Sequence, residues 1–327
     1  MTTRSAMTTR ELVLGTRGSQ LALWQTGHVR SRLIASIPDL AVRVEVIKTL
    51  GDKILDSPLS RIGDKGLFTK EIEHALLERR IDFAVHSLKD LPTNLPEGLA
   101  IGAVLEREEV RDVFIANPGR AVESLANVPP GGTIATGSLR RKSQLLAHRP
   151  DLKIVDIRGN LNTRMSKLDA SDWDGMVLAF AGVKRLGWEQ RVTEILPLDV
   201  MLPAVGQGAL AVEIRSDDDD TRTIVHTLHH AATEQAVLSE RAFLRYLEGG
   251  CQVPIGTHAR IERGELRLDA LVGSLDGRRT VRGSISGPPE QADQLGTLLA
   301  RQLLDKGARE ILDEIRRNAP PVLPSDT

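Results

Sequence analysis

The one cysteine of this 327-residue chain is a candidate for covalent chemistry. Cys251 follows Gly249-Gly250, a pair that ends the preceding helix and places the thiol on a loop. A helix C-terminus carries partial negative charge, so it disfavours a low-pKa thiolate that must act in every turnover. An attachment made only once remains compatible with this position. The alternative is a small buried hydrophobic residue, the commoner fate of a lone cysteine.

A cation and a carboxylate, Lys89 and Asp90, stand side by side after the expected buried strand 82–86. A carboxylate at a strand end can stabilise a cationic intermediate and transfer protons. The same pair of residues is often a surface ion pair, so both interpretations stay open.

Two segments, 14–19 and 134–141, share one design, in which a strand runs into glycine and serine where a helix begins. Backbone N–H groups are unpaired at a helix N-terminus and the dipole is positive there, so each turn can bind a carboxylate or a phosphate. Arg17, Arg140 and Arg141 would add charge-assisted hydrogen bonds. An ordinary serine cap beside a surface arginine is the alternative, and the duplication of the design disfavours it.

Basic residues are concentrated between Thr136 and Lys167, with eight Lys or Arg against two Asp, although the whole chain has a net charge of -1. Arg158 and Arg164 could converge with Arg140 and Arg141 on one strand-end crevice. This local concentration favours a small polyanionic ligand. A solvated helix face and a nucleic-acid site are the alternatives, and the scarcity of aromatic residues, 3%, disfavours the latter.

The composition is that of a globular protein, with 41% hydrophobic and 27% charged residues. A single cysteine excludes an internal disulfide, residues 1–10 lack the apolar core of a signal peptide, and no apolar run is long enough to span a membrane. We therefore expect a cytoplasmic monomer without a metal site, a membrane contact or a nucleic-acid partner. Translation could start at Met1 or at Met7.

Hydrophobic periodicity predicts an α/β chain with three domains. The expected elements are strands 12–16, 42–49, 82–86, 113–116, 133–136, 153–157, 176–179 and 209–214, and helices 19–36, 68–80, 139–148, 161–168, 234–247 and 289–316. Strand 209–214 could return to the first sheet, and the acidic run 217–220 reads as a solvated loop or a helix start. The expected domains are 11–108 with 209–228, then 109–208, then 229–320.

The segment around the cysteine, Glu240-Arg241-x-Phe243 and Leu247-x-Gly249-Gly250-Cys251-x-Val253-Pro254-Ile255-Gly256, resembles the signature of the porphobilinogen deaminase family. Further motifs match in the family's order: Thr16-Arg17-x-Ser19-x-Leu21-Ala22, Thr49-x-Gly51-Asp52, Gly66-Leu67-Phe68-x-Lys70-Glu71, His86-Ser87-Leu88-Lys89-Asp90, Gly137-Ser138-x-Arg140-Arg141, Arg158-Gly159-Asn160 and Pro203-Ala204-Val205-Gly206-Gln207-Gly208.

The resemblance implies two periplasmic-binding-protein-like (type II) α/β domains that flank a cleft, and a small α+β C-terminal domain that carries the cysteine. It also implies a dipyrromethane cofactor joined to Cys251 by a thioether. Four porphobilinogen molecules would be deaminated and added head to tail to this primer, and hydrolysis of the polypyrrole would release hydroxymethylbilane.

Individual roles follow from the same resemblance. Asp90 matches the catalytic carboxylate, which would stabilise the azafulvene formed as ammonia leaves. The expected cofactor-binding residues are Cys251, Lys89, Asp90, Thr136, Ser138, Arg140 and Arg141. The expected substrate-binding residues are Arg17, Ser19, Gln25, Phe68, Arg158, Arg164 and Arg185. Lys65 and Phe68 match a loop that would cover the site. Gly18, Gly137 and Phe180 depart from the family pattern and could alter the shape of the pocket.

Two other functions compete with this one. A two-lobed protein could bind or sense a carboxylate ligand without catalysis, and a transferase could use a phosphate group, although the chain lacks a glycine-rich phosphate loop. Neither alternative explains the segment around Cys251.

Overall fold

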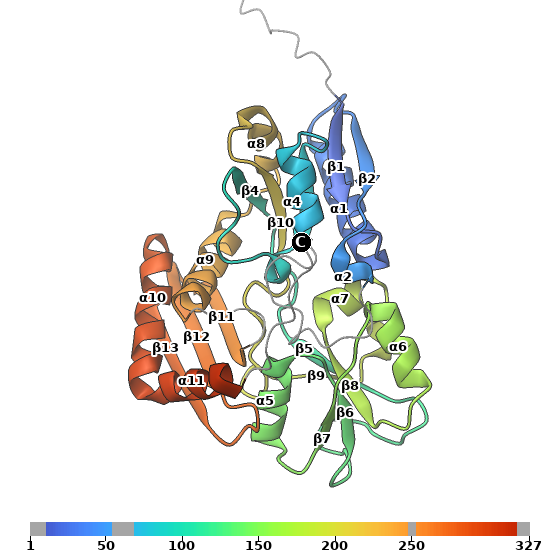
Figure 1. The fold of residues 1–327 in the computed structure, drawn as a ribbon, viewed down its shortest axis with the longest axis vertical. Helices are drawn as coiled ribbons and strands as arrows, with labels where there is room; N and C mark the ends of the chain where they lie inside the picture. Colours follow the sequence, from blue (N-terminus) through green and yellow to red (C-terminus); the bar gives the residue numbers. More distant parts are fainter. Residues whose placement is uncertain (1–10, 54–68, 248–252, 319–327) are drawn as a thin grey trace, which may run out of the picture.

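The computed structural model describes residues 11–53, 69–247 and 253–318, which form two five-stranded sheets and one three-stranded sheet (Figure 1). Lys65, Phe68 and Cys251 lie outside the described residues. In Figure 1 the two larger sheets lie at opposite ends of the molecule, and the small sheet, coloured orange to red, lies beside them.

The first sheet has the strand order β2-β1-β3-β10-β4. Its strands are β1 (Leu12–Thr16), β2 (Val42–Val46), β3 (Phe83–Ser87), β4 (Leu99–Val104) and β10 (Leu210–Arg215). The helices of this part are α1 (Gln20–Ser36), α2 (Leu50–Lys53), α4 (Lys70–Leu77) and α8 (Asp219–His226). β1 is parallel to β2 and β3, whereas β10 is antiparallel to β3 and β4. The strand expected at 209–214 therefore does return to the first sheet, and β4 was missed in the sequence.

The second sheet has the order β7-β6-β8-β5-β9. Its strands are β5 (Asp112–Ala116), β6 (Thr133–Ala135), β7 (Lys153–Val155), β8 (Gly175–Ala179) and β9 (Glu194–Ile195). Its helices are α5 (Leu139–His148), α6 (Leu161–Asp169), α7 (Phe180–Arg185) and the short η2 (Glu189–Arg191). Here β5 is the first strand after the chain leaves the first sheet, and it pairs antiparallel with β8 and β9. Each sheet thus contains one strand, β5 or β10, that follows a crossing of the chain from the other sheet.

Alternation along the strands places a hydrophobic core on each face of the first sheet. Leu12, Leu14 and Phe83 pack with α1, whereas Val13 and Ala84 pack with Ile72 and Leu76 of α4. Two further clusters flank the second sheet in the same way. Helices on both faces of a largely parallel sheet are the α/β arrangement that the sequence predicted.

The C-terminal part is an antiparallel sheet of β11 (Ile255–Glu262), β12 (Glu265–Gly273) and β13 (Thr280–Gly287). It packs against α9 (Ala231–Tyr246), α10 (Ala292–Leu303) and α11 (Arg309–Asn318). The single closing helix expected at 289–316 is wrong: a 3-10 turn (Pro289–Gln291) precedes α10, and the helix breaks over Leu304–Ala308 at Gly307, whose φ is 105°. This sheet with its helices is the expected α+β unit, and with the two α/β units it confirms the predicted fold class.

The acidic run 217–220 is only partly solvated. Asp218 caps α8 by accepting the Thr221 N–H at 3.0 Å, and it pairs with the buried Arg215. Asp219 stays in solvent, with 94% of its side chain exposed. No helix in the described parts of the chain is long and apolar enough to cross a membrane.

Candidate active site

The carboxyl ends of β1 and β3 bring the first group of predicted residues together. These strands are parallel neighbours, so the turns that follow them lie at the same edge of the sheet. After β1, Ser19 caps α1 and its Oγ accepts the Ala22 N–H at 3.2 Å. After β3, Lys89 and Asp90 lie on a single 3-10 turn, η1 (Leu88–Asp90).

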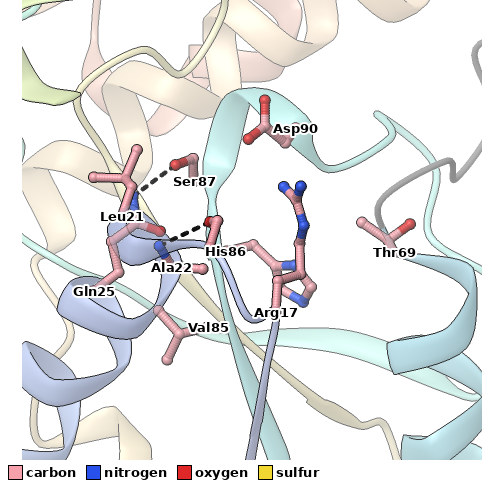
Figure 2. Close-up of a pocket in the computed structure, with 10 residues that line it drawn as sticks. Arg17, Leu21, Ala22, Gln25, Thr69, Val85, His86, Ser87 and Asp90 are labelled. Carbon is pink, nitrogen blue, oxygen red and sulfur yellow. Dashed lines mark hydrogen bonds between the residues drawn. The ribbon is translucent and has the colours of Figure 1, made fainter. Parts of the chain in front are cut away.

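A pocket opens between these two turns (Figure 2). Figure 2 shows the Arg17 guanidinium and the Asp90 carboxyl group extending into the same space. Gln25 is buried and its Nε2 donates to Ser87 Oγ at 2.8 Å, which fixes one wall. The pocket is lined by Arg17, Ser19, Leu21, Ala22, Gln25, Thr69, Val85, His86, Ser87 and Asp90. Four predicted site residues, Arg17, Ser19, Gln25 and Asp90, thus share one pocket.

The second sheet repeats the design after β6. Ser138 caps α5, and its Oγ accepts the Arg141 N–H at 3.4 Å. The Ser138 N–H donates to Oγ1 of the buried Thr136 at 3.3 Å. Both turns that the sequence singled out therefore begin helices with serine caps, as expected from their shared pattern.

A buried carboxylate that the sequence analysis missed organises the arginines of this turn. Asp112 Oδ2 accepts from Arg140 Nη1 at 2.6 Å, and Oδ1 accepts from Arg141 Nη2 at 2.8 Å. Gln207 Nε2 donates to the same Oδ1 at 3.0 Å. Burial would raise the pKa of Asp112, but the charges of Arg140 and Arg141 outweigh it and lower the pKa to about 2. The one sequence feature that could have indicated Asp112 is its position directly before the apolar strand expected at 113–116.

The two arginines have further neutral partners. Arg140 Nη1 donates to the Leu202 carbonyl at 2.6 Å, and Arg141 Nη1 donates to the Val177 carbonyl at 3.0 Å. The buried Arg140 Nε has no hydrogen-bond partner among the residues that the structure describes. Because Asp112 balances only one of two guanidinium charges, the pair retains net positive charge.

Other predicted cations are desolvated near this turn. Burial lowers the pKa of Lys89 to about 8, against the opposing effect of Asp90. Burial, with the like charges of Arg141 and Arg158, lowers the pKa of Arg164 to about 10. The Nε of Arg158 is buried and has no hydrogen-bond partner within the described ranges. Such a group of poorly hydrated cations favours an anionic ligand with several charges.

Arg185 contacts a different segment of the chain from these cations. Its Nη2 donates to the Gly208 carbonyl, 2.7 Å away, in the segment that leads back to the first sheet. Burial lowers the pKa of Arg185 to about 10. Arg185 therefore contacts a connection between the two large sheets.

Phe180 and the glycines that depart from the family pattern occupy different environments. Phe180 packs at the edge of the core of the second sheet. A Cβ on Gly137 would lie 2.6 Å from the Ile157 carbonyl oxygen, so a side chain there would displace backbone. Gly18 is exposed and has room for a side chain beside Val46. No cluster of potential metal ligands occurs among the described side chains.

Comparisons with known proteins give the same family for both parts of the chain that family models match. Residues 12–223 match the family model described as porphobilinogen deaminase, dipyromethane cofactor binding domain, and residues 234–305 match the model of the C-terminal domain. A porphobilinogen deaminase of Chlorobium phaeobacteroides (strain BS1) is 54% identical over 94% of this chain and 99% of its own length. One from Carboxydothermus hydrogenoformans is 52% identical over 95% of this chain and 99% of its own.

Solved structures that resemble the chain include a probable amino-acid ABC transporter extracellular-binding protein of Bacillus subtilis. It has a TM-score of 0.41 and 6% identity over 68% of this chain and 90% of its own. The L-cystine solute receptor of Neisseria gonorrhoeae has a TM-score of 0.39 and 12% identity over 75% of this chain and 95% of its own.

Proposed function

This chain belongs to the porphobilinogen deaminase family, and from that membership we propose which residues carry out the reaction. The protein is a transferase of tetrapyrrole biosynthesis that condenses four porphobilinogen molecules on a dipyrromethane primer and yields hydroxymethylbilane. This sets aside the alternatives of a binding module without catalysis and a phosphate-dependent transferase. The observation that supports the site assignment best is the pocket that places Asp90 beside Arg17.

The residues of the turn between β6 and α5 fit the primer's carboxylates. Arg140 has a buried Nε without a hydrogen-bond partner among the described residues, and an anion would satisfy it. We assign the primer to Lys89, Asp90, Thr136, Ser138, Arg140 and Arg141, with attachment at Cys251, which lies outside the described residues. When bound, the primer supplies the nucleophilic pyrrole carbon on which the chain grows.

Asp112 gives the two primer-binding arginines fixed positions. A guanidinium group that is already bound to a buried carboxylate and a carbonyl loses little side-chain entropy when it binds a ligand. The pair therefore acts as a rigid cationic surface. Its residual charge and the Arg140 Nε, which has no hydrogen-bond partner in the described ranges, remain for the primer.

Asp90 is the group that stabilises the electron-poor carbon left when ammonia departs from the substrate. Its carboxylate faces the pocket at a strand end, where a preorganised negative charge can attract a developing cation. Arg17 and Ser19 bind the substrate's acetate or propionate group at the N-terminus of α1. Gln25 and Ser87 hold the wall against which the pyrrole ring packs.

The remaining assignments concern the growing chain. We assign Arg158 and Arg164 to carboxylates of later pyrrole rings. We also assign Arg185, which contacts the connection between the two large sheets, to substrate binding. Lys65 and Phe68, outside the described residues, would cover the site and exclude water that could quench the azafulvene.

We propose domains at 11–108 with 209–228, at 109–208 and at 229–320. Sheet membership supports the return of the chain after residue 208. We also propose that the protein acts as a monomer in the cytoplasm, where a thioether-bonded single cysteine requires no oxidising compartment.

Replacing Arg17 by glutamine is expected to lower kcat/KM about 10- to 100-fold, because a charge-assisted hydrogen bond to the substrate's carboxylate is lost. Steady-state kinetics with porphobilinogen measure this effect. Arg43→Gln, at an exposed arginine of β2, is the control and should keep normal kinetics. Equal values of kcat/KM for Arg17→Gln and the native enzyme would contradict the assignment.

Intact mass spectrometry tests the proposed function directly. The native protein should carry an added mass of two pyrrole units and gain further single-pyrrole steps when porphobilinogen is added. Cys251→Ser should carry neither. A folded native protein whose mass equals that of the bare chain before and after substrate addition would refute the proposal.

A further inference from the structure

A buried histidine and a buried carboxylate adjoin the pocket, and neither has a role in the assignments above. His86 lines the pocket with Arg17 and Asp90 (Figure 2) and is 5% exposed. Its Nε2 lies 2.9 Å from Oε2 of Glu213, which is fully buried on β10. β3 and β10 are hydrogen-bonded neighbours in the middle of the first sheet, so this pair is held by rigid backbone.

The imidazole is the group that compensates this carboxylate. Neither the oxygens of Glu213 nor Nε2 of His86 make an aligned hydrogen bond within the described ranges, and the His86 ring is the one basic group there within ion-pair distance of Glu213. A buried carboxylate without such compensation is costly. Glu73 of α4 also faces the pair, and burial together with the charge of Glu213 raises the pKa of Glu73. The charged and titratable groups around His86 are thus Glu73, Glu213, Arg17 and Asp90.

The contact with Glu213 bears on which nitrogen of His86 is available for chemistry. Nε2 lies 2.9 Å from a carboxylate oxygen, although without an aligned hydrogen bond, and this negative charge favours the tautomer in which Nε2 carries the proton. Nδ1 is then the nitrogen with the lone pair, and it is the one that can accept a proton. A carboxylate that orients an imidazole in this way also stabilises the imidazolium formed when the ring accepts a proton.

Every condensation must release a proton, and Asp90 is poorly suited to accept it. A carboxylate that stabilises a cation loses its negative charge when it takes up a proton. A second group that removes the proton would let Asp90 remain charged throughout chain growth. His86 lies in the same pocket, and imidazole is the side chain that most often serves as a general base.

We propose that His86, positioned by Glu213, is the general base that removes this proton. The new bond joins the methylene carbon of the deaminated substrate to the free α-carbon of a pyrrole. The C–H bond at that α-carbon then breaks, its electron pair returns to the ring and restores aromaticity, and the proton moves to Nδ1 of His86. Glu213 stabilises the imidazolium until it gives the proton to water. This inference rests on the proposed function.

The test uses His86→Gln and porphobilinogen deuterated at its free α-carbon. Rapid-quench intact mass spectrometry follows the growth of pyrrole adducts on the enzyme. Growth should slow by about 10²-fold, and deuterium should slow it further because C–H cleavage has become rate-limiting. The native enzyme should show a smaller isotope effect. Unchanged growth, or slower growth with no increase in the isotope effect, would overturn the proposal.

Two more variants complete the experiment. His258→Gln replaces another buried histidine, on β11 and outside the pocket, and should keep the native rate and isotope effect. Glu213→Gln removes the charge that stabilises the imidazolium, so the acidic limb of the rate–pH profile should move to lower pH. If His86→Gln fails to fold, an unshifted limb in Glu213→Gln overturns the proposal. Primer mass in the native enzyme tests the proposed function separately.

Discussion

Alanine in place of Asp90 is expected to reduce turnover by about 10³-fold, the effect of removing a preorganised electrostatic group from a transition state. The carboxylate is the negative charge that faces Arg17 across the pocket, where the substrate's carbon becomes electron-poor as ammonia leaves. The primer should still be present, because Arg140 and Arg141 do not depend on Asp90 for their positions. Steady-state kinetics combined with intact mass measures both results.

The control for this variant is Glu97→Ala, which removes an exposed carboxylate outside the pocket and should leave turnover unchanged. Asp90→Asn keeps the shape but not the charge, so it should resemble Asp90→Ala if electrostatic stabilisation is the role. Turnover of Asp90→Ala within a few-fold of the native value would refute that role.

Alanine in place of Asp112 is expected to destabilise the protein by about 3–5 kcal/mol, because the change leaves two buried guanidinium groups without their carboxylate. Asp112 is fully buried, and it is bound by Arg140, Arg141 and Gln207. Urea unfolding measures the loss. The fraction of protein that carries the primer should fall as well, because the arginines lose their fixed positions.

Asp217→Ala serves as the control, since it breaks an ion pair with Arg79 in which both side chains are more than half exposed. An exposed pair contributes about 0–1 kcal/mol. Equal urea midpoints for the two variants would contradict the structural role of Asp112.

The pH dependence of stability gives a second measure of Asp112. Its folded-state pKa, about 2, is lower than the unfolded value of about 3.9. Its stabilisation is therefore fully present above the unfolded pKa and is lost as pH falls from about 4 through about 2. In Asp112→Asn, which cannot ionise, this part of the acid sensitivity should disappear.

Local features of the chain could be predicted from the sequence alone. Ser19 and Ser138 were recognised as helix starts because an N-cap depends on residues a few positions away. The pattern of strands and helices predicted both α/β units, and the motifs around Cys251 and Asp90 indicated the family. The sequence thus determined the fold class and the family, and it proposed most of the candidate site residues.

Only the tertiary structure decided which distant groups meet. Asp112 reaches Arg140 and Arg141 because β5, which follows the crossing from the first sheet, is inserted between β8 and β9. Glu213 reaches His86 because β10 is inserted between β3 and β4. Sequence periodicity reports which face of a strand is buried, but it does not report which strand lies next to it. The partners of buried charges are set by sheet order and register, and these emerge only when the whole chain packs.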